Sequence, residues 1–203
     1  MNWTPVLISL FMIVGPVAAM QIEADPRSIA SFMDKSLTPE LDILQVATDI
    51  SADNHLVFQV KTRGEQINGK NSDYLLLQIL HEKTYLLLLP LNKEEGDKIL
   101  IYEGTLQPEN HKLSKITGEF KEYNLSADFT AKRIVRGAEF TVPLDWINYG
   151  ADFNFDAYTI QASMQGNTLQ INKVYDQARK GRKEEKRFSA ITLLNKICSP
   201  KKR

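Results

Sequence analysis

The sequence predicts an all-β protein, an antiparallel two-sheet β-sandwich followed by a basic C-terminal tail that is expected to be helical. Short segments with alternating apolar residues recur along the chain, and turn residues separate them about every 8–12 residues. This spacing favours a sandwich over alternating strands and helices. Apolar residues make up 43% of the chain, which is enough to build a hydrophobic core.

Residues 1–19 are interpreted as a secretory signal peptide. The apolar runs VLISLFMIV and PVAA have the length of a signal core and are too short for an ordinary membrane span. Val17 and Ala19 suit the two small-residue positions of a cleavage site. Because MNWT contains no Lys or Arg, an uncleaved anchor is the alternative. We expect a secreted or periplasmic protein, cut near Ala19.

Residues 20–38 are expected to form an N-terminal arm, either extended or with a short helix around Ile29 to Met33. The predicted sandwich domain covers residues 39–176. It opens with two strand-like segments, LDILQVATDI and HLVFQVKTRG, and the turn cluster SADN lies between them.

Alternation predicts which strand residues face the core. In the segment HLVFQVKTRG it places Leu56, Phe58 and Val60 on one face. In the later segment GAEFTVPL it makes Phe140 and Val142 core positions. The two apolar runs of DYLLLQILHEKTYLLLLPL are interpreted as a hairpin, although periodicity alone does not exclude a helix. The strand series continues with KILIYEG, HKLSKITGEF, SADFTAKRI, GAEFTVPL, FDAYTIQASM and NTLQINKVY.

The tail, residues 177–203, differs in charge from the rest of the chain. It holds ten Lys and Arg residues against two Glu residues, a balance of +8 in a chain whose net charge is zero. Phe188, Ile191, Leu194 and Ile197 recur near helical spacing. Either the tail packs against the sandwich, which is the favoured interpretation, or its cations bind a protein partner or an anionic surface. The candidate interaction residues are Arg179, Lys180, Arg182, Lys183, Lys186 and Arg187.

Three segments resemble the DOMON-like domains and the related family-nine carbohydrate-binding modules. They are DILQVATDISADNHLVFQVKTRG, GAEFTVPLDWINYGADFNFDAYTIQAS and LQINKVYDQA, and the resemblance covers roughly residues 42–176. The resemblance implies a two-sheet sandwich that binds a sugar in some branches and haem in others.

In the sugar-binding branch, two aromatic rings hold the sugar and polar side chains bind its hydroxyls. The residues that match here are Trp146, Tyr149 and Asn148. Trp146 also follows Pro143 at the end of a predicted strand, where a large ring can cover the end of the core. We favour this structural role for Trp146.

Haem or calcium is possible but unsupported, and no cofactor is predicted. Haem needs two axial ligands, and the candidates occur without an attachment motif: His55, His81, His111, Met33 and Met164. The segment DFNFD offers alternating oxygen ligands, but the rest of a calcium loop does not follow it. We expect Asp152 and Asp156 to be solvated loop carboxylates, and Phe153 and Phe155 to pack inward. Cys198 is the single cysteine, so no disulfide forms within the chain.

No enzyme is predicted, because no nucleophile turn, zinc motif or phosphate loop occurs. The predicted function is that of an exported, non-catalytic module that binds a carbohydrate or a similar small ligand. The alternatives are an accessory subunit that acts through its tail and a haem-carrying redox domain. Nucleic acid is not an expected partner, because the body of the exported chain is acidic.

Overall fold

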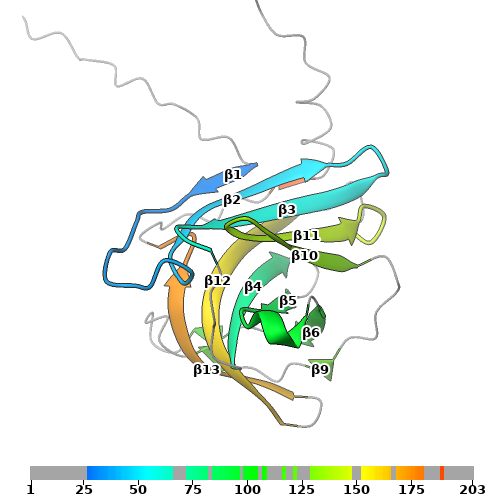
Figure 1. Cartoon of the computed structure of the whole chain (residues 1–203). Helices are drawn as coiled ribbons and strands as arrows, with labels where there is room; N and C mark the ends of the chain where they lie inside the picture. Colours follow the sequence, from blue (N-terminus) through cyan, green and yellow to red (C-terminus); the bar gives the residue numbers. More distant parts are fainter. Residues whose placement is uncertain are drawn as a thin grey trace, which may run out of the picture.

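A computed structural model shows the chain as an all-β protein built from two antiparallel sheets (Figure 1). The structure describes residues 27–65, 72–81, 84–96, 98–104, 107–108, 116–117, 121–122, 129–147, 152–165, 168–180 and 188–189. The predicted all-β class and two-sheet architecture are confirmed. The predicted signal peptide and most of the tail lie outside the described residues.

The first sheet has five strands, in the order β1-β2-β3-β11-β10. Their bounds are Ser28–Ala30 (β1), Ile43–Ile50 (β2), His55–Thr62 (β3), Gly137–Pro143 (β11) and Thr130–Ile134 (β10). Strand β1 is extended and pairs with β2, so this part of the predicted arm belongs to the sheet and is not a helix.

The second sheet has seven strands, in the order β13-β9-β6-β5-β4-β12-β14. Their bounds are Thr168–Gln177 (β13), Lys121–Glu122 (β9), Leu100–Gly104 (β6), Thr84–Pro90 (β5), Asp73–Leu80 (β4), Asp152–Gln165 (β12) and Phe188–Ser189 (β14). A short 3-10 helix, η1 (Lys93–Glu95), follows β5. Strands β7 (Gln107–Pro108) and β8 (Ile116–Thr117) pair with each other.

The seven-stranded sheet curls until it meets itself. Strand β13 pairs with β12 along its length and with β9 through Thr168 and Lys121. These pairings close a ring of six strands, and Figure 1 shows the five-stranded sheet lying across one side of the curved strands. The central strands of the ring therefore have an inner face and a face covered by the other sheet.

Two hydrophobic cores follow from this arrangement. The core between the sheets includes Phe58 and Phe140 from the five-stranded sheet and Phe155 from β12. The rings of Phe58 and Phe155 meet edge to face at 5.3 Å, which joins the two sheets. The second core lies inside the ring and includes Leu76, Leu88 and other residues of the alternate face.

The predicted hairpin forms from β4 and β5, and its apolar runs are buried on both faces. The predicted core positions are also confirmed, because all five side chains are fully buried: Leu56, Phe58, Val60, Phe140 and Val142. The helix expected to include Phe188 is not observed at that residue, because Phe188 and Ser189 pair with β12.

Gly137 allows β11 to approach β3. Its φ is +121°, in the region that favours glycine, and it pairs with Lys61. A Cβ atom at this position would lie 1.9 Å from the carbonyl oxygen of Val60. Any other residue would therefore push the hairpin of β10 and β11 away from the sheet.

Replacing Phe140 with Ala is expected to lower the free energy of unfolding by about 3–5 kcal/mol, because the fully buried ring would leave a cavity beside Phe58. Urea denaturation measures the loss. Thr141→Ala is the matched control, since Thr141 follows on the outer face and its change should cost less than about 1 kcal/mol. Equal losses for the two variants would contradict this packing.

Candidate functional site

Trp146 lies in the turn after β11, where its N–H donates to the carbonyl oxygen of Pro143 at 3.2 Å. Its ring packs edge-on against Tyr85 at 4.5 Å and Phe129 at 5.0 Å, and it is partly buried against the core between the sheets. This packing is the one expected for a ring that covers the end of a core. Ligand binding by Trp146 stays a prediction, and Asn148 and Tyr149 lie outside the described residues.

The first two predicted tail cations bind within the domain. Arg179 donates to Asn154 Oδ1 at 2.7 Å, and Lys180 donates to Asp176 Oδ1 at 2.9 Å. Both side chains thus have partners within the domain, and their part in a tail interaction stays a prediction. The other four candidates lie outside the described residues: Arg182, Lys183, Lys186 and Arg187.

The candidate haem ligands occupy separate elements. Met33 follows β1 and is 54% exposed, and Met164 lies near the end of β12 and is 38% exposed. His55 begins β3, His81 follows β4, and His111 lies outside the described residues. Two exposed methionines do not resemble the enclosed axial ligands that a haem pocket needs.

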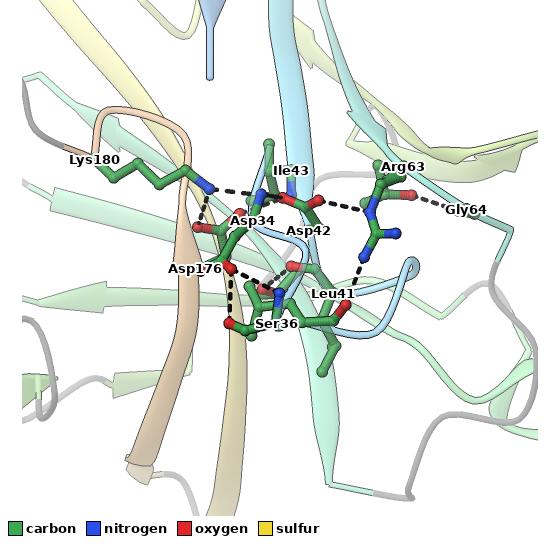
Figure 2. Close-up of polar contacts among 12 residues, drawn as sticks. Asp34, Ser36, Leu41, Asp42, Ile43, Arg63, Gly64, Asp176 and Lys180 are labelled. Carbon is green, nitrogen blue, oxygen red and sulfur yellow. Dashed lines mark hydrogen bonds and ion pairs between the residues drawn. The ribbon is translucent and has the colours of Figure 1, made fainter. Parts of the chain in front are cut away.

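A network of charged side chains joins the two sheets at one end (Figure 2). Asp42, just before β2, is fully buried, and its Oδ2 accepts from Arg63 Nε at 2.8 Å. Its Oδ1 accepts from the N–H of Asp34 at 3.0 Å and lies 3.6 Å from Lys180 Nζ. Across the gap, Asp176 Oδ2 on β13 accepts from the N–H of Ile43 at 2.8 Å. We call Asp42, Arg63, Asp176 and Lys180 the seam network.

The seam network is structural. Arg63 also donates from Nη2 to the carbonyl oxygen of Leu37 at 2.5 Å, so it holds the loop before β2. The Ser36 hydroxyl and N–H donate to Asp34 in this loop, and these hydrogen bonds hold the pKa of Asp34 below its usual value. Each buried carboxylate of the network already has donors from the protein. Among the described residues, no group of three or more His, Cys, Asp or Glu side chains is placed to hold a metal ion.

The predicted exposure of Asp156 is wrong. Asp156 is only 4% exposed, because it lies inside β12 with its carboxyl on the inner face of the ring, opposite Gln78. Burial raises its pKa from 3.8 to about 6, against the opposing effect of hydrogen bonds from Gln177 and from backbone N–H groups. Asp152 is exposed, as predicted, and Phe153 and Phe155 pack inward.

A groove of about 360 Å³ lies on the five-stranded sheet. Apart from the buried Thr48, its residues from β2 and β3 alternate with buried ones such as Val46 and Phe58, so it occupies the outer face, away from both cores. We call it the sheet-face groove. Its lining residues are Arg27, Ser28, Gln45, Ala47, Thr48, Asp49, Val57 and Gln59.

The register of the strands explains the shape of the sheet-face groove. Ser28, Ala47 and Gln59 are cross-strand partners on β1, β2 and β3. Two residues further along β2, on the same face, Asp49 pairs with Val57. Ala47 has the shortest side chain between its longer neighbours, so the surface is hollow there. A side chain of ordinary length at this position would fill the hollow.

The amide groups beside the hollow are held by hydrogen bonds. Gln45 Nε2 donates to Ser28 Oγ at 3.0 Å, and Gln59 Nε2 donates to Glu139 Oε2 at 2.8 Å. Lys132 Nζ lies 2.6 Å from Glu139 Oε1, and its hydrogen bond lowers the pKa of the Glu139 carboxyl. A ligand would therefore meet side chains whose orientation is already fixed.

The chemistry of the lining suits binding. It offers two amides, hydroxyls, one guanidinium and one carboxylate, and it includes no histidine or cysteine. The sequence contains a signal for this groove in the alternation of LQVATD and VFQV, which places Gln45, Asp49 and Gln59 at outward positions. Cross-strand register is needed to see that these positions surround Ala47.

Trp146→Ala should lower the free energy of unfolding by about 2–3 kcal/mol, less than for a fully buried ring, because the contacts with Tyr85 and Phe129 are lost. A thermal melt measures this, and Trp146→Phe should recover part of the loss. Ligand affinity per folded molecule should not change. An unchanged melt together with lost binding would instead identify Trp146 as a ligand platform.

Arg63→Ala should destabilise the fold by about 3 kcal/mol, because it removes the closest cation from the fully buried carboxylate of Asp42. Chemical denaturation checks this value. Arg136→Ala is the control, because Arg136 is an exposed arginine in the turn between β10 and β11. A loss no larger than that of the control would show that Lys180 alone satisfies Asp42.

The described residues include no helix with the length and hydropathy of a membrane span. Comparisons of the chain with family models, with curated proteins and with solved structures found no significant match. The geometry of the candidate sites is therefore what supports a function.

Proposed function

We propose that the protein is an exported, non-catalytic binding module for a carbohydrate or a similar hydroxyl-rich small ligand, and that the sheet-face groove is its binding site. The observation that carries the proposal is the hollow at Ala47, bordered by the fixed amides of Gln45 and Gln59. Its volume of about 360 Å³ is in the range of small-molecule sites.

The polar groups of the groove favour a neutral ligand rich in hydroxyls. An amide both donates and accepts hydrogen bonds, and so does each hydroxyl of a sugar, so the two match without any change of charge. Arg27 and Asp49 contribute one positive and one negative charge to the lining. Their balance gives no preference for an anionic or a cationic ligand.

The position of the groove favours binding without large rearrangement. It lies on three paired strands, β1, β2 and β3, whose opposite face is packed into the core between the sheets. Side chains on such a support lose little further freedom when a ligand binds.

Two expectations from the sequence agree with this proposal. The resemblance to carbohydrate-binding modules points to the same ligand class, and residues 1–19 point to export. The proposed site differs from the one that the resemblance implies, because Trp146 packs on the core between the sheets and is not among the residues of the groove.

Ala47→Leu tests the site, because a larger side chain would fill the hollow from its floor. A glycan array with the wild-type protein identifies the ligand, and calorimetry measures its affinity. We expect Ala47→Leu to lower the affinity at least about tenfold, and Gln59→Ala by about 2–10-fold, the worth of one neutral hydrogen bond. The melting temperature of Ala47→Leu should stay close to that of the wild type.

Thr141→Leu is the matched control, since Thr141 lies on β11 opposite Val57 and does not line the groove. It should keep full affinity. No retained glycan with the wild-type protein would contradict the ligand class. Equal binding by the wild type and Ala47→Leu would contradict the site.

A further inference from the structure

Two loops of the five-stranded sheet expose large apolar side chains. Phe32 is 73% exposed and Met33 is 54% exposed in the loop after β1, and Val135 is 77% exposed in the turn between β10 and β11. Among the described residues, the other exposed large hydrophobic side chain is Met164, where β12 pairs with β13 in the seven-stranded sheet. We call Phe32, Met33 and Val135 the apolar tips.

The strand register places the apolar tips at the same end of the sheet. Ala30, the last residue of β1, pairs with Gln45 on β2, and Gln45 pairs with Lys61 on β3. Lys61 in turn pairs with Gly137, which directly follows the turn between β10 and β11. Each apolar tip lies two or three residues beyond this row. Figure 1 shows the loop after β1 at this end of the sheet, on the left.

Hydrogen bonds to the end of β3 fix both loops. The N–H of Thr62 donates to the carbonyl oxygen of Arg136, in the turn between β10 and β11, at 3.1 Å. The next residue, Arg63, donates from Nη2 to the carbonyl oxygen of Leu37, in the loop after β1, at 2.5 Å. Because their backbones are held, the loops cannot easily turn the apolar tips inward. Contact with water therefore stays unfavourable until something covers these side chains.

Cations predominate among the exposed charges around the apolar tips. In the described residues 31–42, 61–65 and 135–136, the exposed charged side chains are Lys35, Lys61, Arg136 and Glu65. Two acids of the first loop are bound within the protein, since Asp34 accepts from Ser36 and Asp42 accepts from Arg63. This end of the sheet thus combines protruding apolar side chains with exposed positive charge.

This combination suits a lipid bilayer better than a protein partner. Three spacings of about 4.8 Å separate β1 from β11, so the two loops lie roughly 14 Å apart. A protein partner needs a continuous complementary surface, commonly about 800 Å² on each side. A bilayer interface is fluid and admits separate apolar side chains, while its phosphates attract Lys and Arg beside them.

We propose that the apolar tips dock this end of the sheet on a phospholipid membrane, with Lys35 and Arg136 at the headgroup phosphates. The inference is independent of the ligand of the sheet-face groove, because none of the apolar tips lines that groove. It is also independent of the basic tail, the sequence-based candidate for binding an anionic surface.

NMR of isotope-labelled methionine methyl groups tests which part of the protein meets the lipid. The protein is used in its exported form, since the apolar residues 1–19 would themselves bind lipid. Bicelles of equal parts phosphatidylcholine and phosphatidylglycerol are added with and without a nitroxide-labelled lipid. The nitroxide should broaden the methyl signal of Met33 and leave that of Met164 sharp, because Met164 lies on the other sheet.

Cosedimentation with vesicles of the same lipids measures affinity. Phe32→Ser should weaken binding about tenfold, the effect of withdrawing one large apolar side chain from lipid. Lys35→Gln should weaken it about fivefold, the effect of one cation near an anionic surface. Met164→Ser is the matched control and should bind as the wild type does. All three side chains are exposed, so the melting temperatures should stay close to that of the wild type.

Three results would overturn the proposal. The first is no binding to the vesicles by the wild type. The second is binding with equal broadening of Met33 and Met164 and full affinity of Phe32→Ser, which would assign the contact to another part of the chain, such as the basic tail. The third is broadening of Met33 that needs no lipid and grows with protein concentration, which would identify a second copy of the chain as the partner.

Discussion

The structure depends on the burial of β4 from both sides. Every side chain from Asp73 to Ile79 is buried, so the strand needs apolar cover on two faces. The five-stranded sheet covers one face, and the other is enclosed because the seven-stranded sheet curls until β13 meets β9 and β12. The leucines of β4 and β5 thus require both the second sheet and the closed ring.

Double burial also determines where polar side chains lie. A carboxyl that faces inward must find its donors within the protein, since water is excluded. Asp42 and Asp176 find them at the seam, and Asp156 finds them in the Gln177 amide and in the N–H groups of Ala157 and Arg179. The outer face of the five-stranded sheet needs no such internal partners, because solvent is available to it. Polar side chains there surround the hollow at Ala47 and hydrogen-bond to one another, as Gln45 does with Ser28 and Gln59 with Glu139.

The sequence was sufficient for the features that depend on neighbouring residues. Alternation identified Phe58 and Phe140 as core positions, and Pro90 marked the end of a hairpin strand. It was insufficient where distant strands meet. The pairing of β13 with β9, the inward position of Asp156 and the hollow at Ala47 all depend on cross-strand register, which one strand's own pattern does not contain. The ring, the buried carboxyl and the groove were therefore visible only in three dimensions.

The two sets of buried carboxyls differ in how their burial is compensated. Asp42 lies beside two side-chain cations, Arg63 and Lys180, and such direct pairing offsets the cost of removing a charge from water. Asp156 has neutral donors, because the guanidinium of Arg179 is directed to Asn154 and to the carbonyl oxygen of Phe155. Its desolvation is offset only in part, and its pKa rises to about 6. The seam network therefore offsets the burial of Asp42 with charge, whereas neutral hydrogen-bond donors offset the burial of Asp156 only in part.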